Sequence, residues 1–163
     1  KSYINTDEFR MIFLRHELFD AIKAARRLIN FVELMYELYG DVGLQRRIRL
    51  DDLSAKELKI MKLGQLQILP GRDRAGRRMY SFIYMGYNEI EYTVQQRLRV
   101  SFYVQMSLAE DIEAQRKGFV GITWYHNVNM FHDFSIKAKV LKRLKTCAPM
   151  RTGAIHICLN EES

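Results

Sequence analysis

Apolar residues recur every three or four positions through the first third of the chain, as they do along one face of an α-helix. The first such stripe covers residues 6–18, and a longer one follows Asp20, a favourable N-cap, as far as Gly40. A third, shorter helix begins with the capping box Ser-Ala-Lys-Glu at 54–57 and ends at Gly64. The pattern predicts a helical first third, in which the first two helices pack as an antiparallel pair.

After residue 65 the period changes to that of β-strands. The segments 66–69 and 78–85 flank a turn whose Asp73 and Gly76 suit a tight reversal, so they are expected to pair. Helix and strand patterns then alternate: a helix over 90–117 with a break near 107–109, a strand over 119–125, a basic helix over 134–147 and a strand over 153–159.

Such alternation with short connections is typical of parallel strands joined by right-handed crossovers. We therefore expect an α/β fold, in which a helical N-terminal subdomain at 1–64 precedes a mostly parallel sheet with crossover helices at 65–163. The strand at 79–85 belongs in the middle of that sheet, because its residues are nearly all aromatic, branched or Met and neither face suits water. Helices are expected to cover one face, and the other face is covered by more helices or by a ligand.

Composition narrows the class of protein. The chain has 163 residues, of which 48% are hydrophobic and 28% charged, as in a globular domain with a real core. No apolar run approaches the ~20 residues of a membrane helix, and the first residues lack the pattern of a signal peptide. Cys147 and Cys158 are expected as buried, reduced thiols on a helix end and a strand. These features favour the cytoplasm.

The net charge of +7 favours polyanionic partners, either a nucleic acid or an anionic membrane surface. The basic residues form three groups: Arg46, Arg47 and Arg49; Arg72, Arg74, Arg77 and Arg78; and Lys137, Lys139, Lys142, Arg143 and Lys145. Proteins that bind single strands interleave aromatic residues with such charges, whereas here the aromatic residues lie in nearly charge-free strands and are expected to be buried. We expect no nucleic-acid partner and keep a basic nucleic-acid-binding domain as the lesser alternative.

The sequence has no recognisable motif for catalysis. Gly86 alone follows the strand at 79–85, which is too few glycines for a dinucleotide loop, and the turn at 71–77 lacks the Lys-Ser/Thr ending of a P-loop. The four histidines are too scattered for a metal motif, and no Gly-x-Ser-x-Gly elbow occurs. We therefore expect a protein that is not an enzyme and that needs no cofactor or metal ion.

Several segments, taken in order, resemble one known family. They are FLRHELFDAIKAARRLINFVELMYELYG, LPGRDRAGRRMYSFIYMG, the long helix, GFVGITWYHN and APMRTGAIHICLNE. The most specific of them is Asp-x-x-Gly-Arg directly before an aromatic strand. In this order they resemble the CRAL-TRIO family of retinaldehyde, tocopherol and phosphatidylinositol carriers. The resemblance implies an α/β domain whose sheet is the floor of a cavity for one hydrophobic ligand, closed by a mobile helix.

The function implied by the resemblance is the binding and intracellular transfer of a lipid or other hydrophobic molecule by a monomer. The candidate pocket residues are Tyr80, Phe82, Tyr84, Tyr103, Ile122, Trp124, Ile155 and Ile157. The candidate membrane-surface residues, for transient contact with anionic lipid, are Arg72, Arg74, Arg77 and Arg78.

Two departures from the family and one alternative complete the expectations. Met150 follows Pro149 where phosphatidylinositol-transferring members have Glu, so that headgroup anchor is not expected. The sequence stops at Ser163, which implies a fold truncated before its gate helix. The alternative is a degenerate scaffold, an interaction or regulatory module without ligand, which Trp124 and Tyr84 pointing into the open face of the sheet would favour.

Overall fold

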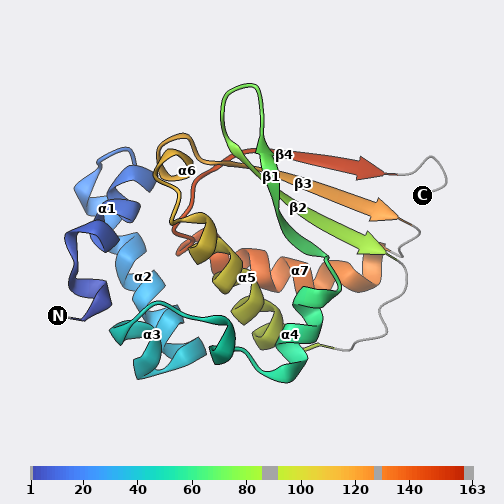
Figure 1. Ribbon diagram of the computed structural model, residues 1–163, viewed down its shortest axis with the longest axis horizontal. Coiled ribbons are helices and arrows are strands. Elements are labelled where there is room, and N and C mark those ends of the chain that lie inside the picture. The colour runs from blue at the N-terminus through green and yellow to red at the C-terminus, as the bar shows by residue number, and fades with distance from the viewer. Residues whose placement is uncertain (1, 86–91, 127–129, 160–163) are drawn as a thin grey trace.

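Figure 1 shows the computed structural model, which describes residues 2–85, 92–126 and 130–159. In these residues the first part of the chain has helices as its only regular elements, and the second part contains the sheet together with three further helices. The first part contains η1 (Tyr3–Asn5), α1 (Asp7–His16), α2 (Ala21–Tyr39), α3 (Asp41–Gln45), η2 (Leu50–Asp52) and α4 (Ala55–Lys62). The second contains β1 (Leu66–Arg72), β2 (Arg78–Met85), α5 (Val94–Leu108), α6 (Ile112–Lys117), β3 (Phe119–His126), α7 (Met130–Lys145) and β4 (Thr152–Leu159).

Side-chain caps determine where the first helices begin. The side chains of Thr6 and Asp20 accept hydrogen bonds from the backbone N–H three residues further on, at 3.3 and 3.1 Å. The capping box at 54–57 is confirmed, with both of its reciprocal hydrogen bonds present. Helix α1 ends before Leu18, earlier than expected, because Leu18 and Phe19 have positive φ angles of 52° and 67° in the turn to α2.

The sheet has four strands in the order β1-β2-β3-β4. The first pair is antiparallel and the other two pairs are parallel, as the alternation of helix and strand predicts. The long helix is interrupted where expected, so that α5 and α6 are separate. The prediction of an α/β fold with helices followed by a mostly parallel sheet is therefore confirmed for the described residues.

The arginine-rich turn between β1 and β2 is organised by Asp73. Its Oδ1 accepts hydrogen bonds from the backbone N–H of Ala75 at 3.0 Å and of Arg77 at 2.8 Å, and its Oδ2 pairs with the Arg77 guanidinium at 2.7 Å. Gly76 has a φ angle of +76°, a conformation that suits glycine. The predicted tight reversal is confirmed.

Helix α5 lies between the N-terminal helices and the sheet (Figure 1), and eight of its 15 residues are buried. Phe102 of α5 stacks on Phe31 of α2, with the ring centroids 4.7 Å apart, and both side chains are fully buried. One hydrophobic core therefore continues from α1 and α2 through α5 to the sheet. Because this core crosses residue 64, the division into two domains at that point stays a prediction.

Arg99 attaches α5 to the first part of the chain. Its Nε pairs with Glu57 Oε1 at 2.7 Å, its Nη2 donates to the carbonyl oxygen of Asp52 at 2.6 Å, and its Nη1 donates to that of Leu38. The guanidinium carbon also lies 4.1 Å from the centre of the Tyr39 ring. Glu57 is only 3% exposed, so Arg99 compensates a buried negative charge.

The two cysteines differ in exposure, and both are free thiols. Cys147 is buried after α7, as expected, and burial raises the pKa of its thiol to about 11. The expectation of a buried thiol is wrong for Cys158, which is exposed. It lies on β4, at the end of the described strand order, where most side chains are exposed.

Candidate functional site

The register of the three parallel strands brings two rows of residues onto one face of the sheet. Tyr80 of β2 is opposite Gly121 of β3, which is opposite Ile155 of β4. Two residues further along, the second row contains Phe82, Thr123 and Ile157. Because strand residues alternate between faces, both rows lie on the same side. The small residues of β3 separate the large side chains of its two neighbours.

A cavity of about 640 Å³ lies between this face and the helices α5 and α7. The sheet contributes Tyr80, Phe82, Phe119, Gly121, Thr123, Tyr125, Thr152, Ile155 and Ile157. The helices contribute Arg97, Ser101 and Gln105 from α5, and Val140, Leu141, Leu144 and Lys145 from α7. Its remaining lining residues are His16, Arg27, Tyr92, Ala148, Met150 and Arg151. The volume lies within the roughly 300–1,000 Å³ that small-molecule pockets occupy.

Tyr80, Phe82, Ile155 and Ile157, four of the residues that the sequence singled out for the pocket, line this cavity. The side chain of a fifth, Tyr84, lies outside the described part of the chain.

The structure does not bring Ile122 and Trp124 to the cavity. They pair with the alternate positions of β2, Ser81 and Ile83, and so lie on the opposite face of the sheet. Trp124 is 46% exposed there and does not fill the cavity, so the scaffold alternative gains no support from it.

The cavity lies on the same side of the sheet as α5 and α7. Of the two coverings that the sequence left open for the second face of the sheet, a ligand on the face opposite the helices is therefore wrong for the described residues. The cavity is on this side because α5 and α7 do not pack closely against β3 and β4. Thr123 is only half-buried, and Ile155 and Ile157 are 63% and 64% exposed, although all three side chains point toward the helices. A ligand in this cavity would lie between sheet and helices.

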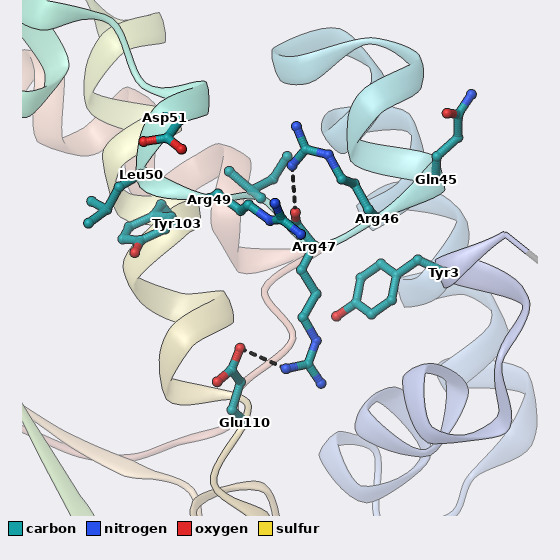
Figure 2. A pocket seen from close by; sticks show the side chains of 10 residues that line it. Tyr3, Gln45, Arg46, Arg47, Arg49, Leu50, Asp51, Tyr103 and Glu110 are labelled. Carbon is teal, nitrogen blue, oxygen red and sulfur yellow. Dashed lines mark hydrogen bonds and ion pairs between the residues drawn. The ribbon is translucent and has the colours of Figure 1, made fainter.

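Tyr103 lies on a different face of α5 from the cavity residues. It lines a second hollow of about 620 Å³, formed with the segment 45–51, Tyr3 and Glu110 (Figure 2). Arg47 crosses this hollow, with its Nη1 paired to Glu110 at 2.9 Å and its guanidinium carbon 5.8 Å from the centre of the Tyr3 ring. The structure therefore separates Tyr103 from the strand residues with which the sequence analysis grouped it.

The arginines of the β1–β2 hairpin mostly have acidic partners within the chain. Arg72 and Arg78 both pair with Asp111 Oδ2, at 2.5 and 2.7 Å, and Arg77 pairs within the turn. Burial opposes ionisation of Asp111, but the hydrogen bonds from these arginines and from the start of α6 hold its pKa below the ordinary value. Arg74 is exposed and has no ion pair with any described residue.

Helix α5 presents a polar stripe to the cavity that sequence reasoning missed. Arg97, Ser101 and Gln105 are spaced four residues apart, so they share one face of the helix. They are only 4%, 2% and 7% exposed. Their spacing was visible in the sequence, but polar residues on a helix are usually solvated, and only the fold shows that these three face a cavity.

Further positive charge lies where α7 ends. Arg27, Lys145 and Arg151 line the cavity there, and Arg27 pairs with Glu17 at 2.5 Å. His16 lies beside them, and its burial, helped by the positive charge of Arg27, lowers its pKa to about 4. His16 is therefore neutral at pH 7, and the charged groups of the cavity wall are cations.

The fold and the cavity agree with a comparison of the sequence with known protein families. The sequence profile of the CRAL/TRIO domain family matches residues 62–159, which is more than half of the chain. The chain belongs to the CRAL/TRIO domain family. This family is generally associated with the binding of lipids and other hydrophobic ligands. In this CRAL/TRIO chain the matched residues include the four described strands, α5 and α7, and so most of the cavity wall.

Two further properties of the CRAL/TRIO chain concern its described residues only. None of the described helices is both long and apolar enough to span a membrane. The same residues contain no group of three or more His, Cys, Asp or Glu side chains placed to hold a metal ion.

Proposed function

We propose that the protein binds one lipid or other hydrophobic molecule between the sheet and the helices α5 and α7, and transfers it inside the cell without chemical change. The observation that carries the proposal is the cavity of about 640 Å³ with its largely apolar and aromatic wall. Membership of a family associated with hydrophobic ligands supports it. Every apolar Å² of ligand that leaves water contributes roughly 25 cal/mol, so no reaction is needed to hold an acyl chain or isoprenoid.

Gly121 offers a way to fill the cavity without moving the backbone. A Cβ atom there would lie 3.8 Å from Ile155 Cγ1 and 3.9 Å from the carbonyl oxygen of Ala154, which is ordinary van der Waals contact. A larger side chain at this position would extend into the space that the proposal assigns to the ligand. Gly121→Leu is therefore the test variant. Ala55→Leu adds similar bulk at an exposed position of α4 and is the matched control.

The experiment is native mass spectrometry of the wild type and both variants, purified from a eukaryotic host, for a co-purified lipid. We expect the wild type and Ala55→Leu to carry lipid, and Gly121→Leu to carry at least about ten-fold less, because a leucine side chain takes the ligand's place. The melting temperature of Gly121→Leu should not fall, since glycine inside a strand is itself unfavourable. Equal lipid loading of Gly121→Leu and wild type would contradict the proposed site.

Transfer also requires contact with a membrane, and we propose that this contact uses α7 more than the paired hairpin arginines. Lys139, Lys142 and Lys145 of α7 are exposed, as is Arg74. Extraction of labelled lipid from vesicles by the same proteins should quicken with anionic lipid content and slow as salt is added, because exposed charges are screened. Extraction that responds to neither would remove the membrane part of the proposal.

A further inference from the structure

The polar stripe on α5 has hydrogen-bonding atoms that the chain itself leaves without partners. Among the described residues, Arg97 Nη2, Ser101 Oγ and Gln105 Oε1 are buried and accept or donate no hydrogen bond. All three side chains are more than nine-tenths buried and line the cavity. Buried polar atoms are normally satisfied, and leaving one unsatisfied is costly. The stripe therefore indicates a polar part of whatever occupies the cavity.

Arg97 determines the charge of that polar part. Its Nη1 donates to the neutral Gln65 Oε1 at 3.3 Å, and its guanidinium carbon lies 5.5 Å from the centre of the Tyr92 ring. No described carboxylate lies within ion-pair distance of it. A buried cation is unfavourable unless an anion and hydrogen bonds compensate it, and a guanidinium matches the geometry of a carboxylate or phosphate.

The other charged residues of the cavity wall are also positive. The cavity is lined by the cations Arg27, Arg97, Lys145 and Arg151, and none of its described lining residues is Asp or Glu. Arg27 is compensated by Glu17, and Arg151 donates to the carbonyl oxygen of Arg116. Arg97 is thus the deeply buried cation that still has an unpartnered nitrogen.

From these observations we infer that the ligand is an amphiphile with an acidic oxygen head, a carboxylate or a phosphate, held by Arg97 with Ser101 and Gln105 beside it. The apolar chain then lies along the sheet and α7, against Phe119, Val140, Leu144 and Ile155. This inference rests on the proposed function, because it names the class of ligand for the same cavity.

The test compares compounds that share one chain and differ in the head: oleate, oleyl phosphate and oleyl alcohol, with inorganic phosphate as the head alone. Dissociation constants are measured with radiolabelled compounds below their critical micelle concentrations. We expect both acids to bind about ten- to a hundred-fold more tightly than the alcohol, because a hydrogen bond between charged groups contributes about that much to affinity. Inorganic phosphate should bind far more weakly than oleyl phosphate.

Substitutions of Arg97 test whether this residue causes the preference for acidic compounds. Arg97→Met should bring the acids to the affinity of the alcohol and leave the alcohol within about three-fold of wild type, whereas Arg97→Lys should retain most of the preference. Arg10→Met removes an exposed arginine from α1 and should change nothing. If Arg97→Met does not fold, the comparison of the compounds on the wild type still decides.

The outcomes separate the two proposals. Equal binding of acids and alcohol by the wild type, or an unchanged preference in Arg97→Met, overturns the acidic head and leaves the hydrophobic cavity intact. Inorganic phosphate that binds as tightly as oleyl phosphate also overturns the inference, because it shows an anion site that takes no chain. Failure of all three chain-bearing compounds overturns the proposed function, and the inference with it.

Discussion

Removing the guanidinium of Arg99 is expected to destabilise the fold strongly. Arg99→Met keeps an apolar side chain in place of the aliphatic part of arginine, but the carboxylate of Glu57, 3% exposed, loses its partner at 2.7 Å. The carbonyl oxygens of Asp52 and Leu38 lose their donor as well. Because α2, η2 and α4 provide these partners, the substitution weakens the attachment of all three to α5.

The magnitude follows mainly from Glu57. Breaking a buried ion pair by removing one partner costs about 3–5 kcal/mol. A carbonyl group left without its donor adds about 1–3 kcal/mol in isolation, but the losses overlap because water reaches these groups together. The backbone N–H of Ser54 still donates to Glu57 Oε2 at 2.8 Å. We therefore expect a loss of about 3–5 kcal/mol from the roughly 5–15 kcal/mol that stabilise a domain.

The measurement is urea unfolding followed by circular dichroism, with the free energy of unfolding and the m value fitted together. Arg116→Met is the control: its pair with Glu113 at 3.1 Å joins side chains that are 61% and 46% exposed, so a loss under about 1 kcal/mol is expected. The double variant Arg99→Met/Glu57→Gln should recover part of the loss, since Gln keeps the capping box without a charge. A loss below about 1 kcal/mol for Arg99→Met at unchanged m value would refute the reasoning.

Two further predictions concern pH and the backbone. His16 has a pKa of about 4 when folded and about 6.5 when unfolded, so the unfolded state binds the extra proton in between, and stability should fall by up to ~1.4 kcal/mol per unit as pH drops through this window. His16→Gln should flatten that part of the pH profile of urea unfolding, and an unchanged slope would contradict the assignment. Gly118 and Gly40 both have positive φ, so alanine is strained at either position. Gly118→Ala should lower the melting temperature more than Gly40→Ala, because a Cβ at Gly118 would lie only 2.6 Å from the carbonyl oxygen of Arg151, whereas a Cβ at Gly40 would meet no atom within 4 Å. Equal effects of the two substitutions would count against the clash.

Much of the fold was predictable because its signals are local. The capping box at 54–57, the Asp73 turn and the change from helical to strand periodicity each depend on a few neighbouring residues. Which face of β3 lines the cavity was not predictable from neighbouring residues. Large apolar Ile122 and Trp124 looked more like ligand contacts than Gly121 and Thr123, but the register with β2 places the small residues over the cavity.

The charged part of the candidate site depended on contacts between distant segments. The hairpin arginines looked free to meet a membrane, because their partner Asp111 lies 33 to 39 residues further along the chain. Arg97, in contrast, lies on a helix that looked amphipathic, and only the packing of α5 between two layers shows that its charge is buried. Pairing and burial of charges are thus properties of the tertiary fold.

The central position of α5 has a consequence for how this protein can be divided. The family match begins at residue 62, yet Phe102 is covered by Phe31, and Arg99 is bound by residues 38–57. A fragment of residues 62–159 would expose one whole flank of α5 to water, and such a flank promotes aggregation. We therefore expect the matched stretch to be shorter than the smallest unit that folds, which would extend back at least to α2.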